Sequence, residues 1–118
     1  MSSRIKASSS NAHNRRLLAE AHDVNDILRT ISARWKMEIL CNITIGVNQF
    51  SRLKEKFPSL SDQILGKRLS EMVSEGILVK EHIPETVPPQ TIYRPTDKAM
   101  ALVQILRQLH VWGNKEWK

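Results

Sequence analysis

Cysteine is nearly absent from this sequence, and glycine is scarce. The single cysteine, Cys41, cannot form an internal disulfide, which fits a reducing compartment. With 4 glycines in 118 residues, the chain contains no glycine-rich loop of the kind that cradles phosphates. No ligand spacing, such as a pair at i and i+4, occurs among the histidines, which are His13, His22, His82 and His110. We therefore expect no metal site, no catalytic residue and no cofactor.

Long hydrophobic runs are also missing. No apolar run approaches the roughly 20 residues that span a bilayer, and the start MSSRIKASSS lacks the apolar core of a signal peptide. We therefore expect a cytoplasmic protein with no membrane partner. A chain of 118 residues fits one domain, which excludes a multidomain enzyme.

Basic residues outnumber acidic ones, 18 to 12, which gives a formal net charge of +6. This charge favours a polyanionic partner, because lysines and arginines that displace counterions provide most of the non-specific affinity for nucleic acid. Residues 1–14 are rich in serine and nearly free of large apolar side chains, so we predict a flexible basic arm there. The arm could contact DNA backbone or be a solvated tail. The folded domain is predicted over residues 15–118.

The stretch 61–78, SDQILGKRLSEMVSEGIL, organises the rest of the chain. Ser61 can cap a helix, Asp62 suits its positive end and Gly76 supplies a left-handed stop. The apolar residues recur at the spacing of one buried helical stripe and are Leu65, Leu69, Met72 and Val73. The opposite side is small or polar and carries Gln63, Gly66, Lys67 and Ser70. Such a face can lie in a groove.

Three further patterns of helical period precede this stretch. The first covers residues 15–32 as one helix or two, the second covers 34–44, and the third covers 48–57 and stops at Pro58. Only three residues separate the third helix from Ser61. Two short helices joined by so tight a turn predict a helix-turn-helix.

After Gly76 the apolar period changes toward alternation, which predicts strands over residues 77–83 and 91–94. The loop between them contains three prolines and cannot join a sheet interior. Thr96 can cap a last helix, whose apolar stripe reaches Trp112 and is broad enough that we expect part of it to pack on a second subunit. The predicted fold is mainly α with a small β-hairpin wing (α+β), a winged helix-turn-helix.

In this order, these residues resemble the HxlR-type family of winged-helix transcription regulators, relatives of the MarR and ArsR groups. The resemblance lies in the strings SARWKMEIL at 32–40, QFSRLKEKFPSLS at 49–61 and LRQLHVWG near the end. The recognition-helix signature corresponds to Leu65, Arg68, Leu69, Glu75, Gly76 and Ile77. The wing signature corresponds to Pro88, Pro89, Tyr93 and Thr96. The resemblance covers about residues 21–113.

The resemblance implies a homodimer formed through the first and last helices, with recognition helices paired across a palindromic operator in double-stranded DNA. The apolar residues of these helices that we assign to the dimer interface are Val24, Ile27, Leu28, Leu102, Leu106, Leu109 and Trp112. The chain departs from the family where His22 replaces a cysteine that some members use as a thiol sensor. It also departs where Gln90 replaces an arginine after the wing prolines.

Base reading needs donors and acceptors aimed at base edges, while phosphate contacts supply position and affinity. We predict that Gln63 and Lys67 read base edges, since glutamine can pair with adenine and lysine with guanine. Arg68 could contact phosphate or form a salt bridge with Glu71. The other candidates for phosphate or backbone contacts, some of which could equally be solvated surface residues, are Arg34, Arg52, Lys54, Gln90 and Thr91.

Three residues are expected to have mainly structural roles. Ser61 and Asp62 lie at the start of the recognition helix and are included among the candidate DNA-binding residues. We expect capping to be their main role, although Asp62 could accept a hydrogen bond from cytosine. Cys41 follows Leu40 on an apolar helix and is expected to be a buried, inert thiol.

We interpret the sequence as a dimeric regulator of transcription that binds double-stranded DNA. The main alternative is a winged helix that binds protein without specific DNA binding, since the fold serves both purposes. The face over residues 63–70 lacks the exposed aromatic and methionine anchors of a protein interface, which favours DNA. A small-molecule effector between the dimerisation helices and the winged domain is a hypothesis that rests only on the wide apolar stripes.

Overall fold

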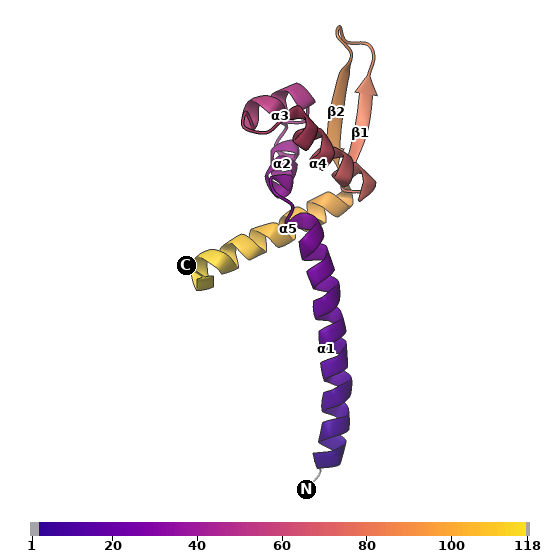
Figure 1. The fold of residues 1–118 in the computed structure, drawn as a ribbon, viewed down its shortest axis with the longest axis vertical. Coiled ribbons are helices and arrows are strands. Elements are labelled where there is room, and N and C mark those ends of the chain that lie inside the picture. Colours follow the sequence, from indigo (N-terminus) through magenta and orange to yellow (C-terminus); the bar gives the residue numbers. More distant parts are fainter. Residues whose placement is uncertain (1–2, 118) are drawn as a thin grey trace. The chain divides into compact units, whose positions relative to one another are not determined.

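The computed structural model describes residues 3–117 of the chain. The chain divides into two compact units, Met1–Arg34 and Trp35–Lys118. The first unit contains one helix, and the second contains the predicted winged helix-turn-helix (Figure 1).

Helix α1 (Ser3–Ile31) is continuous over 29 residues, so the first helical pattern forms one helix and not two. It also takes in residues 3–14, which belong to the segment that we predicted as a flexible arm. A helix that has already nucleated extends readily through residues of good helix propensity, such as Ala7 and Ala12. The flexibility of this segment and its contact with DNA stay predictions. Polar contacts near the end of α1 are local, as in the hydrogen bond from Thr30 Oγ1 to the Asp26 carbonyl at 3.1 Å.

The second unit begins with three short helices (Figure 1). They contribute side chains to one apolar core. They are α2 (Lys36–Thr44), α3 (Phe50–Lys56) and α4 (Asp62–Ser74). These bounds lie inside the predicted ranges 34–44, 48–57 and 61–78. Only residues 57–61 separate α3 from α4, which confirms the helix-turn-helix.

Trp35, directly before α2, has a φ of 74°, in the left-handed region. A residue with a side chain is strained there by roughly 1–3 kcal/mol, so packing must hold it in place. The Trp35 ring packs on the core and meets Phe57 edge-on, with ring centroids 6.0 Å apart. This contact ties the start of α2 to the end of α3. The next residue, Lys36, is buried.

Strands β1 (Leu78–Ile83) and β2 (Gln90–Pro95) form an antiparallel hairpin, which confirms the predicted wing. The outer edge of β2 is also paired, because the Tyr93 amide donates to the Asn48 carbonyl at 2.9 Å. The residues just before α3 therefore hold the base of the wing, a contact that periodicity alone could not predict.

Helix α5 (Asp97–Trp112) begins at its predicted cap, since Thr96 Oγ1 accepts a hydrogen bond from the Ala99 amide at 3.2 Å. Ala99 is fully buried, and Leu102 and Val103 pack partly against the core. Most side chains beyond Val103 are exposed. The first two turns of α5 thus belong to the core, and the remainder presents apolar and polar residues to the surface.

The core draws on four helices and both strands of the second unit. Its buried apolar residues are Ile39, Leu40, Ile43, Leu53, Phe57, Leu60, Leu65, Leu69, Met72, Ile77, Leu78, Tyr93 and Ala99. Nowhere in residues 3–117 is a helix both long enough and apolar enough to cross a membrane. The fold is mainly α with a β-hairpin wing, as predicted.

The capping hydrogen bond at the start of α4 gives a first prediction. Ser61 Oγ accepts from the Ile64 amide at 3.1 Å, so replacing Ser61 with alanine leaves that amide without its acceptor. Ser61→Ala should lower the free energy of unfolding by about 1 kcal/mol in a urea titration. Ser59→Ala, which removes an exposed hydroxyl from the same turn, is the matched control. Equal losses in the two variants would show that Ser61 is not a stabilising cap.

Candidate nucleic-acid interface

Helix α4 has two faces of opposite character. Leu65, Leu69 and Met72 are fully buried and fix one face in the core. Gln63 and Lys67 are exposed on the other face, and Ser70 is exposed one turn later. The predicted division into a buried stripe and a polar outer face is therefore present.

The N-terminal end of α4 is fixed by polar contacts with α3. Ser61 caps the helix, as predicted. Lys54 Nζ lies 3.4 Å from Asp62 Oδ1 and donates a hydrogen bond to the Leu60 carbonyl. Lys54, which we predicted as a phosphate ligand or a solvated charge, thus stabilises the turn between the two helices. A DNA contact by Lys54 or Asp62 would have to form in competition with this pair.

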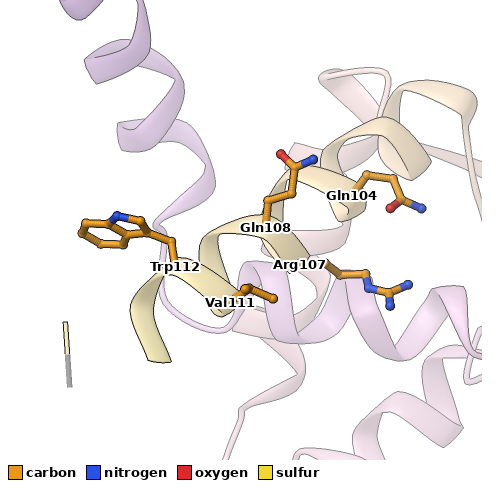
Figure 2. A pocket seen from close by; sticks show the side chains of 5 residues that line it. All are labelled: Gln104, Arg107, Gln108, Val111 and Trp112. Carbon is orange, nitrogen blue, oxygen red and sulfur yellow. The ribbon is translucent and has the colours of Figure 1, made fainter. Parts of the chain in front are cut away.

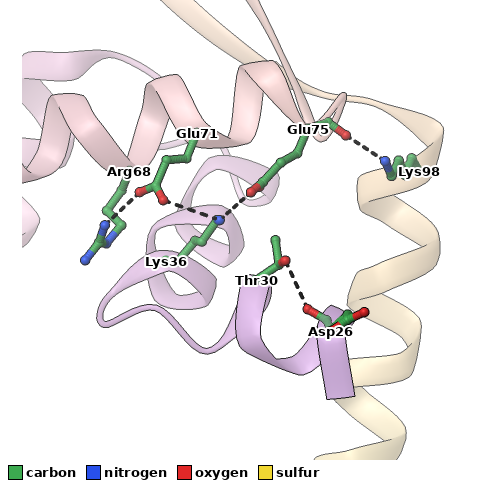
Figure 3. A network of polar contacts seen from close by, with 7 residues as sticks. All are labelled: Asp26, Thr30, Lys36, Arg68, Glu71, Glu75 and Lys98. Atoms are coloured by element: carbon green, nitrogen blue, oxygen red, sulfur yellow. Dashed lines mark hydrogen bonds and ion pairs between the residues drawn. The ribbon is translucent and has the colours of Figure 1, made fainter. Parts of the chain in front are cut away.

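The C-terminal end of α4 holds an ionic cluster (Figure 3). Lys36 Nζ lies 2.8 Å from Glu75 Oε2 and 4.0 Å from Glu71 Oε2. Arg68 NH1 lies 2.7 Å from Glu71 Oε1, which is the salt bridge that we weighed against a phosphate contact. Lys36 was missed in the sequence, where it resembles any basic residue near a helix start. The signal that could have indicated a basic partner is the pair Glu71 and Glu75, two acids one turn apart at the end of α4 that need a cation between them.

These ion pairs change the charge that α4 presents. The stretch 61–75 contains two basic and three acidic residues, a sum of −1. All three acids nevertheless lie beside cations, in the pairs Asp62–Lys54, Glu71–Arg68 and Glu75–Lys36. The outer face thus combines the exposed Lys67 with neutral polar side chains. Such a face suits a polyanion better than the sum of charges indicates.

The pKa of the Glu71 carboxyl, on α4, is shifted from its ordinary value. Partial burial disfavours its charged form, but the hydrogen bond from Arg68 and the positive charges of Lys36, Arg68 and Lys67 outweigh that effect. The pKa of Glu71 therefore lies below the usual value for a glutamate. The carboxylate is the form that holds the cluster together.

The two wing candidates differ in how free they are to contact DNA. Gln90 Oε1 accepts a hydrogen bond from Gln49 Nε2 at 3.2 Å, so its side-chain oxygen is held by the segment before α3. Thr91 is partly exposed on the same strand. The loop over residues 84–89 carries Glu85 and no lysine or arginine. The tip of this wing therefore offers no cation to a phosphate.

A small hollow lies where α4 meets the wing. Its volume is about 140 Å³, and it is lined by Ser70, Val73, Lys80 and Tyr93. Lys80 is exposed beside Ser70, at the edge of the polar face of α4. Lys80 lies within the strand predicted over residues 77–83, and its closeness to α4 becomes visible only in the fold.

The two remaining candidates lie outside α4 and the wing. Arg52 is exposed on α3. Arg34 is exposed in the first unit and is described with that unit alone. The structure thus brings together Gln63, Lys67 and Ser61 on α4 with Lys54 on α3, whereas it gives no common surface for Arg34 and the others.

The residues assigned to dimerisation are exposed on α1 and partly exposed on α5. In α1, Val24, Ile27 and Leu28 have exposed fractions of 51%, 55% and 46%. In α5, Leu109 and Trp112 are 52% and 50% exposed, while Leu102 and Leu106 are partly buried. Apolar side chains exposed to this extent on both helices are typical of surfaces that pack against another chain.

Helix α5 also lines a hollow on the surface (Figure 2). The hollow has a volume of about 470 Å³ and is lined by Gln104, Arg107, Gln108, Val111 and Trp112. The Trp112 ring is in contact with Trp117, with centroids 5.8 Å apart. Because one helix supplies all five lining residues, the hollow is a shallow feature of its surface and not an enclosed ligand cavity.

Cys41 is exposed, so the prediction of a buried thiol was wrong. Its neighbours Ile39, Leu40 and Ile43 occupy the buried side of α2, and position 41 falls outside that stripe. Partial withdrawal from water still raises the pKa of the thiol, which lowers the thiolate fraction at neutral pH. Within residues 3–117, no three histidine, cysteine or carboxylate side chains gather as a metal site would require.

Comparison with known proteins identifies similar chains. The model of the HxlR-like helix-turn-helix family matches residues 30–118. The HTH-type transcriptional regulator YvaP of Bacillus subtilis is 37% identical over 87 residues, which are 74% of this chain and 79% of YvaP. The region that the family model matches contains α2 to α5 and hence the complete helix-turn-helix and wing.

Solved structures share the same fold. A MarR-family transcriptional regulator from Enterococcus faecalis V583 superposes with a TM-score of 0.74 at 27% identity, over 80% of this chain and 86% of that protein. Diamide-treated YodB from Bacillus subtilis superposes with a TM-score of 0.68 at 25% identity, over 78% of this chain and 90% of YodB.

The lowered pKa of Glu71 gives a prediction for acid stability. A carboxyl whose pKa is depressed in the folded state adds stability at pH values above its unfolded pKa, roughly 4.3, and this contribution disappears as the pH falls through the folded pKa. Glu71→Gln should therefore be less stable than the wild type at pH 7, and the difference should shrink as the pH falls below about 4. Urea titrations across this range would measure it.

Glu116→Gln is the matched control, because Glu116 is exposed in the C-terminal turn. At pH 7 its loss of stability should be much smaller than that of Glu71→Gln. A difference for Glu71→Gln that is constant with pH would contradict the ionic role of Glu71.

Proposed function

Because this chain belongs to the HxlR-like helix-turn-helix family, we propose that it is a regulator of transcription that binds specific sequences in double-stranded DNA. It acts as a homodimer on a palindromic operator. Two features of α4 support the proposal. One face of the helix is buried in the core while the other is polar and exposed, and its three acidic side chains form ion pairs with neighbouring cations.

In this proposal α4 enters the major groove and reads base edges. Gln63 can make a bidentate contact with adenine, and Lys67 can donate to the N7 and O6 of guanine. Both side chains are exposed and lie one helical turn apart on the same face. Ser70, one further position along this face, and Lys80 at the base of the wing extend the surface toward the hairpin.

Phosphate contacts fix the position of α4 in the groove. Arg52 on α3 is exposed and suits this role, as do Arg34 and the strand residue Thr91. Arg68 and Gln90 are already held by Glu71 and Gln49, so a DNA contact by either would use its remaining N–H donors. The wing tip lacks cations, so α3 and α4 should supply most of the affinity for phosphate.

A homodimer would cover the exposed apolar residues of α1 and α5. Two recognition helices in such a dimer would meet two half-sites about 34–36 Å apart, one turn of the DNA helix. The place of action is the cytoplasm, and we expect no enzymatic activity. A small-molecule effector stays a hypothesis, since the hollow on α5 does not enclose one.

A protein-binding winged helix is not favoured. The exposed face of α4 is polar, and its only large apolar side chain with substantial exposure in the described structure is Ile64, at 36%. Protein interfaces usually depend on buried aromatic or arginine anchors, which this face does not provide.

The division between base reading and phosphate binding gives the main test. A specific duplex is first selected from a randomised pool with the wild-type protein, and affinities for it and for a random duplex are measured across a salt series. Lys67→Ala should lose roughly 1–3 kcal/mol on the selected duplex and relax the preference at one base position. Arg52→Ala should weaken both duplexes alike and reduce the salt slope by about one unit.

The two variants serve as controls for each other, since each removes one positive charge from an exposed position. Identical effects of both changes on both duplexes would contradict the assigned roles. A wild-type protein that binds no duplex at any salt concentration would overturn the proposed function.

The exposed apolar surface of α5 gives a prediction about assembly. Leu109→Glu places a charge on a side chain that a dimer would bury, so light scattering should show a monomer where the wild type is a dimer. Ile45→Glu alters an apolar residue that is 78% exposed outside α1 and α5, and this control should remain dimeric. Dimers of equal stability in both variants would exclude this part of α5 from the interface.

A further inference from the structure

We propose that Lys36 is a positioning residue for the recognition helix. Its buried ammonium fixes the rotation of α4 and thereby sets sequence preference, although Lys36 itself does not contact DNA. This inference rests on the proposed function, because it explains how a DNA-reading helix is held.

The burial of Lys36 is the first step. Its side chain is only 1% exposed, so Lys36 carries a charge that is buried in the protein. A buried ammonium is costly unless it is paired, so its partners matter. It lies 2.8 Å from Glu75 Oε2, across 39 positions of sequence. The contact joins the first residue of α2 to the C-cap residue of α4.

Lys36 engages two successive turns of α4. Glu71 Oε2 lies 4.0 Å from the same Nζ atom, and Glu71 and Glu75 are four residues apart on one helix face (Figure 3). A cation placed between them opposes rotation of α4 about its axis, because rotation would carry both carboxylates away together. The positive charge also lies at the C-terminal end of α4, where the helix dipole favours it.

Helix α5 holds the same end of α4. Lys98 Nζ donates to the Glu75 carbonyl at 2.6 Å, and Thr96 Oγ1 donates to the Gly76 carbonyl at 2.7 Å. Glu75 therefore meets α2 through its side chain and α5 through its backbone. This residue is the junction at which the orientation of α4 is set.

The geometry of base reading makes rotation important. Side chains reach roughly 5–6 Å from a helix axis, so a rotation of about 10° moves their tips by about 1 Å. Hydrogen bonds to base edges tolerate only a few tenths of an ångström around 2.9 Å. Phosphate attraction is less directional. Loss of the Lys36 contact should thus reduce the preference between sequences much more than the overall affinity.

The test uses the full chain with Lys36→Met, Glu75→Gln and the double variant. Methionine keeps the apolar stem and removes the ammonium. Lys115→Met, which removes an exposed lysine from the C-terminal turn, is the matched control. Each protein binds the duplex selected by the wild type and a random duplex of equal length, and amide hydrogen exchange is followed in the DNA-free proteins.

Lys36→Met should reduce the ratio of selected to random affinity at least tenfold, with random affinity within twofold of the wild type and an unchanged salt slope. Glu75→Gln should reduce the ratio at least threefold, and the double variant should lose no more than Lys36→Met alone. Amides of residues 66–76 should exchange faster in Lys36→Met and at the wild-type rate in Lys115→Met.

Preserved preference or unchanged exchange in Lys36→Met would overturn the inference. A lower salt slope with equal losses on both duplexes would also overturn it, since Lys36 would then behave as a phosphate contact. If the wild-type protein selects no sequence, the proposed function fails first and the inference fails with it, whereas a selective wild type beside a selective Lys36→Met leaves the proposed function standing.

Discussion

Helix α4 can present one face to DNA only because its other face is fixed in the core. Leu65, Leu69 and Met72 are fully buried, and each turn of the helix contributes at least one of them. Burial of such side chains supplies roughly 1.5–3 kcal/mol each, which dominates the stability of a small domain. Apolar packing is not strongly directional, however, and the polar contacts at the two ends of α4 determine its orientation. Ser61 and Lys54 act at the beginning, and Lys36 acts at the end.

The pairing of acidic residues explains how a segment with a sum of −1 can face a polyanion. Each acid of α4 lies beside a cation from its own helix or a neighbouring one, so its charge is compensated locally. The outer face carries Lys67 and neutral side chains, and the exposed Asp62 at the start of α4 lies beside Lys54. Charge counting along a sequence ignores direction, and for an amphipathic helix direction decides which charges a ligand encounters.

Most of the fold could be predicted because its signals are local. The caps at Ser61 and Thr96, the stop at Gly76 and the apolar period of each helix depend on neighbours within a few residues. The contacts that the sequence could not show join distant positions: Lys36 meets Glu75, and Gln49 meets Gln90. The prediction that Cys41 is buried was wrong for a different reason. The helical period identifies the buried stripe of α2, but Cys41 lies beside that stripe and is exposed. The roles of candidate site residues in DNA binding stay predictions.

Helix α5 connects two tasks within the second unit. Its first turn is hydrogen-bonded to the end of α4 through Lys98 and Thr96, while its later turns expose Leu109 and Trp112. If a second copy covers those later turns, a shift of α5 in forming the dimer would reach Glu75 along the helix, over the 11 positions between Leu109 and Lys98. A rigid helix transmits such a shift with little loss, because its backbone hydrogen bonds resist bending. The distance between two recognition helices would then be set by α5, the same helix whose first turn holds the end of each α4.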